Sequence, residues 1–129
     1  MTGTKCMLDT SIIIQAFRKN NNVAEVLEQL EEIFIPTIVL GELWYGAFKS
    51  GNASKHSIQI ESFVHQCIIV PIDMQTAGFY GNIKAELASK GKLIPENDIW
   101  IGACALQFNI PLFTNDRHFE SITGIKLFS

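Results

Sequence analysis

The sequence predicts one α/β domain of three layers, in which a central, mostly parallel sheet lies between two layers of helices. Short apolar runs alternate with longer segments of helical periodicity along the 129 residues. Strands that are separated by helices favour parallel pairing with right-handed crossovers. Because the runs are apolar, we expect helices on both faces of the sheet. The length, without linkers or repeats, fits a single domain that spans residues 1–129.

Five short apolar runs are predicted to form the strands. Each is only a few residues long and is bounded by Asp, Pro or Asn, which are depleted in strands. Along the chain these runs are Lys5–Leu8, Ile33–Ile35, Ile68–Ile72, Leu112–Thr114 and Ile125–Phe128. The sheet is therefore expected to have five strands.

The segments between the runs have helical spacing. Apolar residues recur at i, i+3, i+4 and i+7 from Val23 to Leu30, with glutamates on the opposite face, and again from Ile60 to Cys67. Further helices are expected over 12–18, 37–49, 74–89 and 98–108, with Gly, Asn and Pro between them.

Composition narrows the class of protein. The three cysteines include no CxxC pair and are odd in number, which disfavours a zinc site or a disulfide framework. Such cysteines fit a reducing cytoplasm. We find no pattern of a signal peptide or a membrane span, so we expect a soluble protein. Apolar residues make up 47% of the chain, which is high for a small domain. We therefore expect part of the surface to meet a partner and the chain to form a homodimer.

Four isolated acidic residues stand out from the apolar pattern. Asp9 follows the first predicted strand and Asp116 follows the fourth. In open α/β sheets, ligands bind beyond these carboxyl ends of the strands. Glu42 and Asp98 are each the only charge in the apolar stretch around them. A helix that is apolar on nearly all sides is expected to be buried, and a buried carboxylate needs a partner.

Each acid also has an ordinary explanation. Asp9 can cap a helix, Glu42 can form an ion pair, Asp98 can favour the positive end of a helix and Asp116 can serve a turn. However, no Lys or Arg is an obvious partner along the chain for the first three of these acids. A shared divalent cation explains all four together, and carboxylate oxygens suit Mg²⁺ or Mn²⁺ better than zinc.

A cation site also changes what the net charge implies. Two such ions about 4 Å apart are a common device for cutting phosphodiesters. The net charge of −3 disfavours nucleic acid when it is read over the whole chain. Setting the four acids aside leaves nine of the 13 acidic residues against ten basic ones, so the rest of the protein is not acidic.

Four short motifs surround these acids: MLDTS (7–11), GELWYG (41–46), NDIWIGACAL (97–106) and TNDRHF (114–119). In order and spacing they resemble the acidic motifs of the PIN-domain family, most closely those of its short bacterial VapC-type toxins. The resemblance extends over nearly the whole chain and implies a three-layer PIN-like fold. It implies four acids that bind metal and act in catalysis, Asp9, Glu42, Asp98 and Asp116. It also implies supporting hydroxyl groups on Ser11 and Thr114.

The same resemblance implies an activity. It is that of a Mg²⁺- or Mn²⁺-dependent endoribonuclease that prefers single-stranded RNA, the toxin of a toxin–antitoxin system whose small antitoxin protein blocks the site. Two alternatives stay open: a non-toxin PIN protein in RNA processing, and a degenerate module that binds RNA or protein without cutting. Four intact acids favour an enzyme, because clustered carboxylates without metal repel one another.

Other families and other residues fit less well. Phosphatases of the haloacid dehalogenase type need a second Asp where this chain has Ser11, and response-regulator receivers need adjacent acids after the first strand. Asp73 is interpreted as the N-cap of the helix 74–89. His118 could touch RNA or metal but is interpreted as a packed or surface residue. Trp44 and Tyr45 could belong to the core or to a partner surface and are interpreted as core residues.

Overall fold

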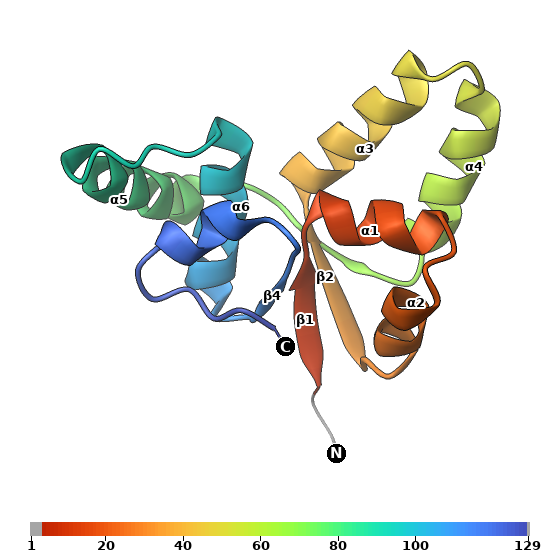
Figure 1. Ribbon diagram of the computed structural model, residues 1–129, viewed down its shortest axis with the longest axis horizontal. Coiled ribbons are helices and arrows are strands. Elements are labelled where there is room, and N and C mark those ends of the chain that lie inside the picture. Colours follow the sequence, from red (N-terminus) through yellow and green to blue (C-terminus); the bar gives the residue numbers. More distant parts are fainter. Residues whose placement is uncertain (1–3, 129) are drawn as a thin grey trace.

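The computed structural model describes residues 4–128 and shows a parallel sheet between two layers of helices (Figure 1). The strands are β1 (Lys5–Leu8), β2 (Glu32–Pro36), β3 (Ile68–Val70) and β4 (Leu112–Phe113). Their order in space is β3-β2-β1-β4, and every neighbouring pair is parallel. The α/β class and the three layers expected from the sequence are therefore confirmed.

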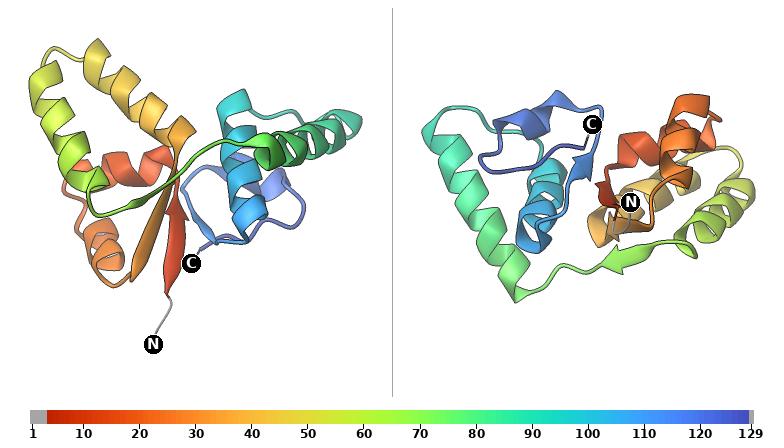
Figure 2. Two further views of the ribbon diagram at one scale, coloured as in Figure 1. Left: turned by 180° about the vertical axis from the view of Figure 1, so that it is seen from behind. Right: turned by 90° about the horizontal axis from the view of Figure 1, so that it is seen from below.

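Helices cover both faces of this sheet. In Figures 1 and 2, α1 to α4 lie on one side, and α5, α6 and the 3-10 helix η1 lie on the other. Their bounds are α1 (Thr10–Phe17), α2 (Asn21–Glu28), α3 (Thr37–Lys49), α4 (Ala53–Val64), α5 (Met74–Ser89), α6 (Glu96–Phe108) and η1 (Arg117–Ser121). An exposed loop joins α5 to α6, and Gly91 in this loop has a φ of 65°, which Gly adopts without steric cost.

The predicted fifth strand is wrong. Within residues 4–128 the sheet has four strands, and the segment Ile125–Phe128 meets β4 only in one parallel bridge between Leu112 and Leu127. β4 has only two residues, and of these Leu112 faces the segment: its amide donates to the Lys126 carbonyl and its carbonyl accepts from the Phe128 amide, both at 2.8 Å. The apolar run at the end of the chain therefore packs beside β4 without extending the sheet.

The apolar core lies around β1 and α6. Met7 and Leu8 in β1 and Ile99 and Ile101 in α6 are fully buried. The expected burial of the helix that carries Asp98 is confirmed, and this acid stands where the buried helix begins. Within residues 4–128, no helix combines the length and the apolar character that spanning a bilayer requires.

The expectation that the helix carrying Glu42 is buried on nearly all sides is wrong. α3 buries one stripe of residues four positions apart, Val39, Leu43 and Ala47. Tyr45 and Phe48 are 67% and 69% exposed, so Tyr45 is not a core residue. Trp44 is half-buried and stacks on Phe48, with ring centroids 5.5 Å apart. A helix that is apolar on nearly all sides is thus not always buried, because its outer face can be available to a partner.

Candidate active site

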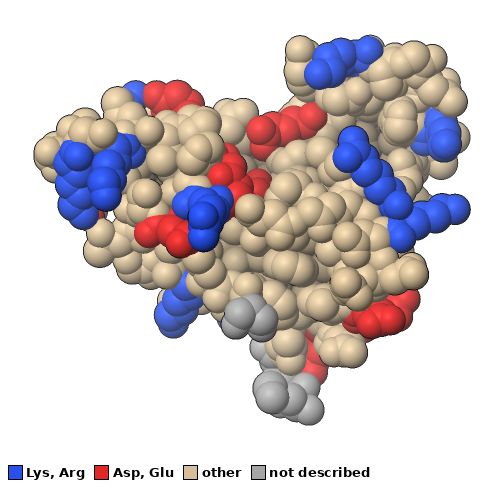
Figure 3. All heavy atoms as spheres, viewed as in Figure 1, with Lys and Arg blue, Asp and Glu red and all other residues tan. Residues whose placement is uncertain are grey.

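The four predicted acids lie at the edge of the sheet where β1 and β4 end. Asp9 and Asp116 follow these adjacent strands, Asp98 lies in the first turn of α6, and Glu42 lies in the second turn of α3. Figure 3 shows acidic side chains in the hollow between the two layers of helices. The structure therefore brings together side chains from four separate segments of the chain.

Asp9 ends β1 and is the N-cap of α1. Its side-chain Oδ1 accepts a hydrogen bond from the Thr10 amide at 2.7 Å, so the capping role is real. The other oxygen, Oδ2, accepts from the Ser11 hydroxyl at 3.1 Å and the Thr114 hydroxyl at 2.6 Å. Asp9 is only 5% exposed, and burial raises the pKa of its carboxyl. Capping uses one oxygen and leaves the other facing the site.

Thr114 connects two of the acids. Its hydroxyl donates to Asp9 Oδ2 and accepts from the Asp116 amide at 2.9 Å. The pairing of β1 with β4 makes this possible, because the Asp9 amide bonds to the Phe113 carbonyl at 3.1 Å and brings the two strand ends together. Thr114 and Ser11, the two predicted supporting hydroxyls, both contact Asp9.

Asp98 is buried close to other acids. It is 8% exposed, and burial together with the nearby Asp116 and Asp9 raises the pKa of Asp98 to about 6. The hydrogen bond from His118 acts in the opposite direction and does not cancel burial. Its place in the first turn of α6 favours the charged form as well, and burial still prevails. Asp98 therefore carries a charge that the protein alone does not fully compensate.

His118 is a functional candidate that sequence reasoning weighs but places second to a packed or surface role. Its Nδ1 lies 3.0 Å from Asp98 Oδ2 and 2.9 Å from Asp116 Oδ1. The hydrogen bond with Asp98 raises the pKa of His118. The side chain is 50% exposed, as expected of a surface residue, but it contacts two acids of the site. The signal in the sequence is its position two residues after a strand-end Asp, within the first turn of η1.

Glu42 approaches the same edge from α3. Its Oε1 accepts from the Thr10 hydroxyl at 2.6 Å, and its Oε2 accepts from the Asn97 side-chain amide at 3.4 Å. Thr10 is next to Asp9 and Asn97 is next to Asp98, so these two neighbours hold Glu42 between the other acids. Within residues 4–128, no Lys or Arg forms an ion pair with any of the four acids.

The donor set fits a hard divalent cation. Ligand atoms of Asp98, Asp116 and His118 all lie within 4.8 Å of one another, which is the spacing of groups that share one ion. Carboxylate oxygens are the ligands that Mg²⁺ and Mn²⁺ prefer. Asp9 and Glu42 lie beside this group, and an electrostatic interaction with Asp9 reaches Asp98. A cation here would offset the uncompensated charge of Asp98.

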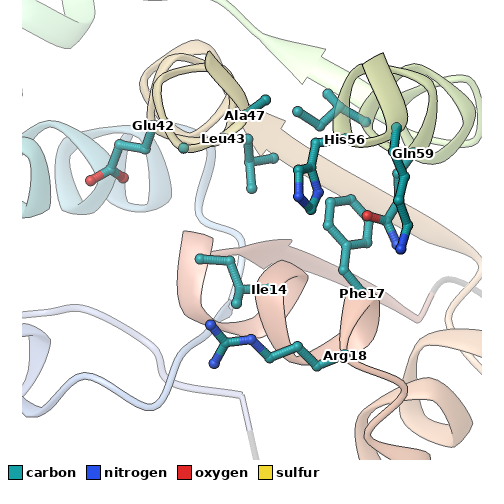
Figure 4. A pocket seen from close by; sticks show the side chains of 11 residues that line it. Ile14, Phe17, Arg18, Glu42, Leu43, Ala47, His56 and Gln59 are labelled. Atoms are coloured by element: carbon teal, nitrogen blue, oxygen red, sulfur yellow. The ribbon is translucent and has the colours of Figure 1, made fainter. Parts of the chain in front are cut away.

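An apolar groove runs up to the acids on the side of α1. It has a volume of about 340 Å³ and lies between α1, α3 and α4, with Ile14, Phe17 and Leu43 among its lining residues. Figure 4 shows Glu42 at one end of this groove and His56 and Gln59 across from α1. A molecule lying in the groove would reach the site.

Known proteins share these features over the length of the chain. The PIN domain family model matches residues 6–125. The ribonuclease VapC2 of Haemophilus influenzae is 35% identical over 127 residues, which cover 95% of each chain. The tRNA(fMet)-specific endonuclease VapC of Shigella flexneri is 34% identical over 127 residues, again 95% of each chain.

A solved structure extends the likeness to three dimensions. The crystal structure of VapBC2 from Rickettsia felis, bound to a DNA fragment from their promoter, matches with a TM-score of 0.91 at 31% identity. The match covers 97% of this chain and 98% of that chain. Together with the family model, these similarities show that the chain belongs to the PIN-domain family.

Proposed function

We propose that this chain is a metal-dependent endoribonuclease that cleaves single-stranded RNA and acts as the toxin of a VapBC-like toxin–antitoxin pair in the cytoplasm. The observation that carries the proposal is the convergence of four carboxylates at one sheet edge, with no Lys or Arg partner among residues 4–128. The ribonuclease and endonuclease names of the relatives, and the VapBC complex among similar structures, support the same activity and partner.

The four acids have distinct positions in this proposal. Asp98 and Asp116 would hold Mg²⁺ or Mn²⁺, and Asp9 and Glu42 would complete the site. The bound cation supplies activation of the attacking water and charge neutralisation at the phosphate. The hydroxyls that bond to Asp9, and Thr10 and Asn97 at Glu42, keep the carboxylates oriented before RNA arrives. A module that only binds would have no use for this crowding of negative charge.

A cleavage assay tests the activity directly. We expect the purified protein in Mg²⁺ to cut both an unstructured RNA oligonucleotide and initiator tRNA within single-stranded segments. Hydrolysis by water leaves a 5′-phosphate and a 3′-hydroxyl, and the ends are identified by mass spectrometry. A Glu42→Gln protein purified in parallel detects contaminating ribonuclease. Products with 2′,3′-cyclic phosphate, which arise from attack by the ribose 2′-hydroxyl, would rule out the proposed chemistry.

The antitoxin is proposed to lie in the groove between α1, α3 and α4. The lining is largely apolar at its floor, where Leu43, Ala47 and Ile60 are buried, and Glu42 stands at its end. A peptide segment that buries its own apolar side chains here would be led to the acids and could cover them. The same surface would then both bind the antitoxin and allow it to block the active site.

Gly46 gives a way to close the groove without disturbing the fold. It lines the groove on α3, and a Cβ at this position would meet no heavy atom within 4 Å apart from the adjoining residues and backbone of its own helix. We expect Gly46→Gln to weaken binding of the antitoxin by about tenfold or more, which is about 1.4 kcal/mol. RNA cleavage by the free protein should stay within about twofold of wild type.

Gly81→Gln on α5 is the matched control, since Gly81 is also exposed, helical and free of neighbours within 4 Å. Both substitutions replace a helical Gly by a better helix former, so neither should lower the melting temperature. Isothermal titration calorimetry gives the affinities. Equal antitoxin affinity for the two variants would show that the partner does not use this groove.

A further inference from the structure

The imidazole of His118 is held against two of the acids by the backbone of η1. Asp116 caps this short helix, and its Oδ1 accepts from the His118 amide at 2.9 Å. The same oxygen lies 2.9 Å from Nδ1 of the His118 ring, and Asp98 Oδ2 lies 3.0 Å from that nitrogen. One ring nitrogen therefore faces two carboxylates that come from different elements, α6 and the β4–η1 turn.

One proton on the imidazole ring cannot form good hydrogen bonds to both carboxylates. Nδ1 carries at most one hydrogen and can direct it well at only one of the two carboxylate oxygens. Two adjacent ligands of an octahedral ion, each about 2.1 Å from the ion, are about 3.0 Å apart. The spacings of 3.0 Å and 2.9 Å from Nδ1 to the two oxygens match that value. The nitrogen and the two oxygens have the spacing of three ligands of one cation.

We infer that His118 Nδ1 is a nitrogen ligand of the cation held by Asp98 and Asp116, and that it biases the site toward Mn²⁺ over Mg²⁺. The inference rests on the proposed function, because it concerns the same cation. Mg²⁺ strongly prefers oxygen, whereas first-row transition ions also accept imidazole nitrogen. His118 is therefore a residue that sets metal preference, placed there by the turn that follows Asp116.

Pulsed electron paramagnetic resonance of bound Mn²⁺ tests the ligand directly. We expect the wild-type protein with one equivalent of Mn²⁺ to show hyperfine coupling to a ¹⁴N nucleus of imidazole. The coupling should be lost in His118→Asn, whose side chain offers an oxygen in place of the nitrogen. His56→Asn is the control, since His56 lines the groove and forms no part of the acid cluster, and it should keep the coupling.

Metal affinities give a second readout that does not depend on activity. We expect His118→Asn to lower the ratio of Mn²⁺ affinity to Mg²⁺ affinity by about tenfold, as measured by calorimetric titration in the absence of RNA. His118 is half exposed, so the substitution should leave the melting temperature of the metal-free protein near that of wild type.

The outcomes separate the two proposals. Mn²⁺ that binds in an Asp98-dependent manner without nitrogen coupling overturns the role of His118 and leaves the nuclease proposal standing. Coupling that persists in His118→Asn also overturns it, because another nitrogen would then be the ligand. A wild-type protein that binds no Mn²⁺ contradicts both the inference and the metal-dependent function.

Discussion

Replacing Asp98 by Asn should abolish RNA cleavage and raise the melting temperature of the metal-free protein. Asn keeps the shape of the side chain and one oxygen that can accept from His118, but it removes the charge that attracts a cation. Loss of a group that only supports a metal ligand costs about 10–100-fold in activity, so loss of a ligand should cost at least about 100-fold. Activity and stability should therefore change in opposite directions.

The stability gain follows from the sign of the pKa shift. Burial raises the pKa of Asp98 from its usual 3.8 to about 6, so the folded protein binds a proton more tightly than the unfolded chain. The free energy of unfolding then falls as pH rises from about 3.8 to about 6, and the full penalty is present at neutral pH. Asn carries no such penalty. Thermal melts at pH 7.5 in EDTA measure the difference.

Asp73→Asn is the matched control for Asp98→Asn. Asp73 is the N-cap of α5, as the sequence predicts, and accepts from the Thr76 amide at 3.0 Å. That hydrogen bond and the one from Gln107 lower the pKa of Asp73, so here the charged form stabilises the fold. The same substitution should therefore lower the melting temperature and leave cleavage unchanged. If Asp98→Asn behaves like this control, Asp98 is a structural residue and not part of a nuclease site.

Removal of divalent metal should abolish cleavage by the wild-type protein, and Mg²⁺ or Mn²⁺ should restore it. The expected loss is complete within the detection of the assay, because activation of the attacking water depends on the cation. The protein should remain folded throughout, since the core around β1 and α6 is built from apolar side chains that need no metal. Restoration after dialysis into Mg²⁺ separates chelation from unfolding.

Metal binding should also appear as stability. A ligand at about 100 times its Kd stabilises the folded state by about 2.7 kcal/mol when it binds one site and does not bind the unfolded chain. Mg²⁺ or Mn²⁺ should therefore raise the melting temperature of wild type by several degrees and that of Asp98→Asn by far less. Cleavage that survives exhaustive chelation, or equal stabilisation of both proteins by metal, would contradict the metal site.

The acids were accessible to sequence reasoning because each one breaks a simple apolar pattern. Asp9 and Asp116 each end an apolar strand, and parallel strands place such ends on one edge of the sheet. Asp98 and Glu42 are each the only charge in the apolar stretch around them. Neither of these two acids has an obvious Lys or Arg partner in the sequence. Among residues 4–128 no Lys or Arg forms an ion pair with any of the four acids, and His118 is the partner of Asp98 and Asp116.

The other features depend on geometry that a pattern does not encode. His118 acquires its contacts from a five-residue 3-10 helix, which is too short to show a period, and from the cap formed by Asp116. The apolar composition of α3 does not distinguish a face that packs on the core from one that stays exposed, so composition alone predicts the wrong environment for Tyr45. The run Ile125–Phe128 has a strand's composition but only a two-residue partner in β4.

The loop after α5 divides the four acids into two equal sets. Asp9 and Glu42 precede Gly91, and Asp98 and Asp116 follow it. A backbone cut in this exposed loop would give two fragments that each carry two of the acids. The four acids would come together only after β4 had paired with β1 again. The protein could therefore be split at this loop into two fragments that are each inactive. An added interaction that brings the fragments together would then control a nuclease that is toxic to its own host.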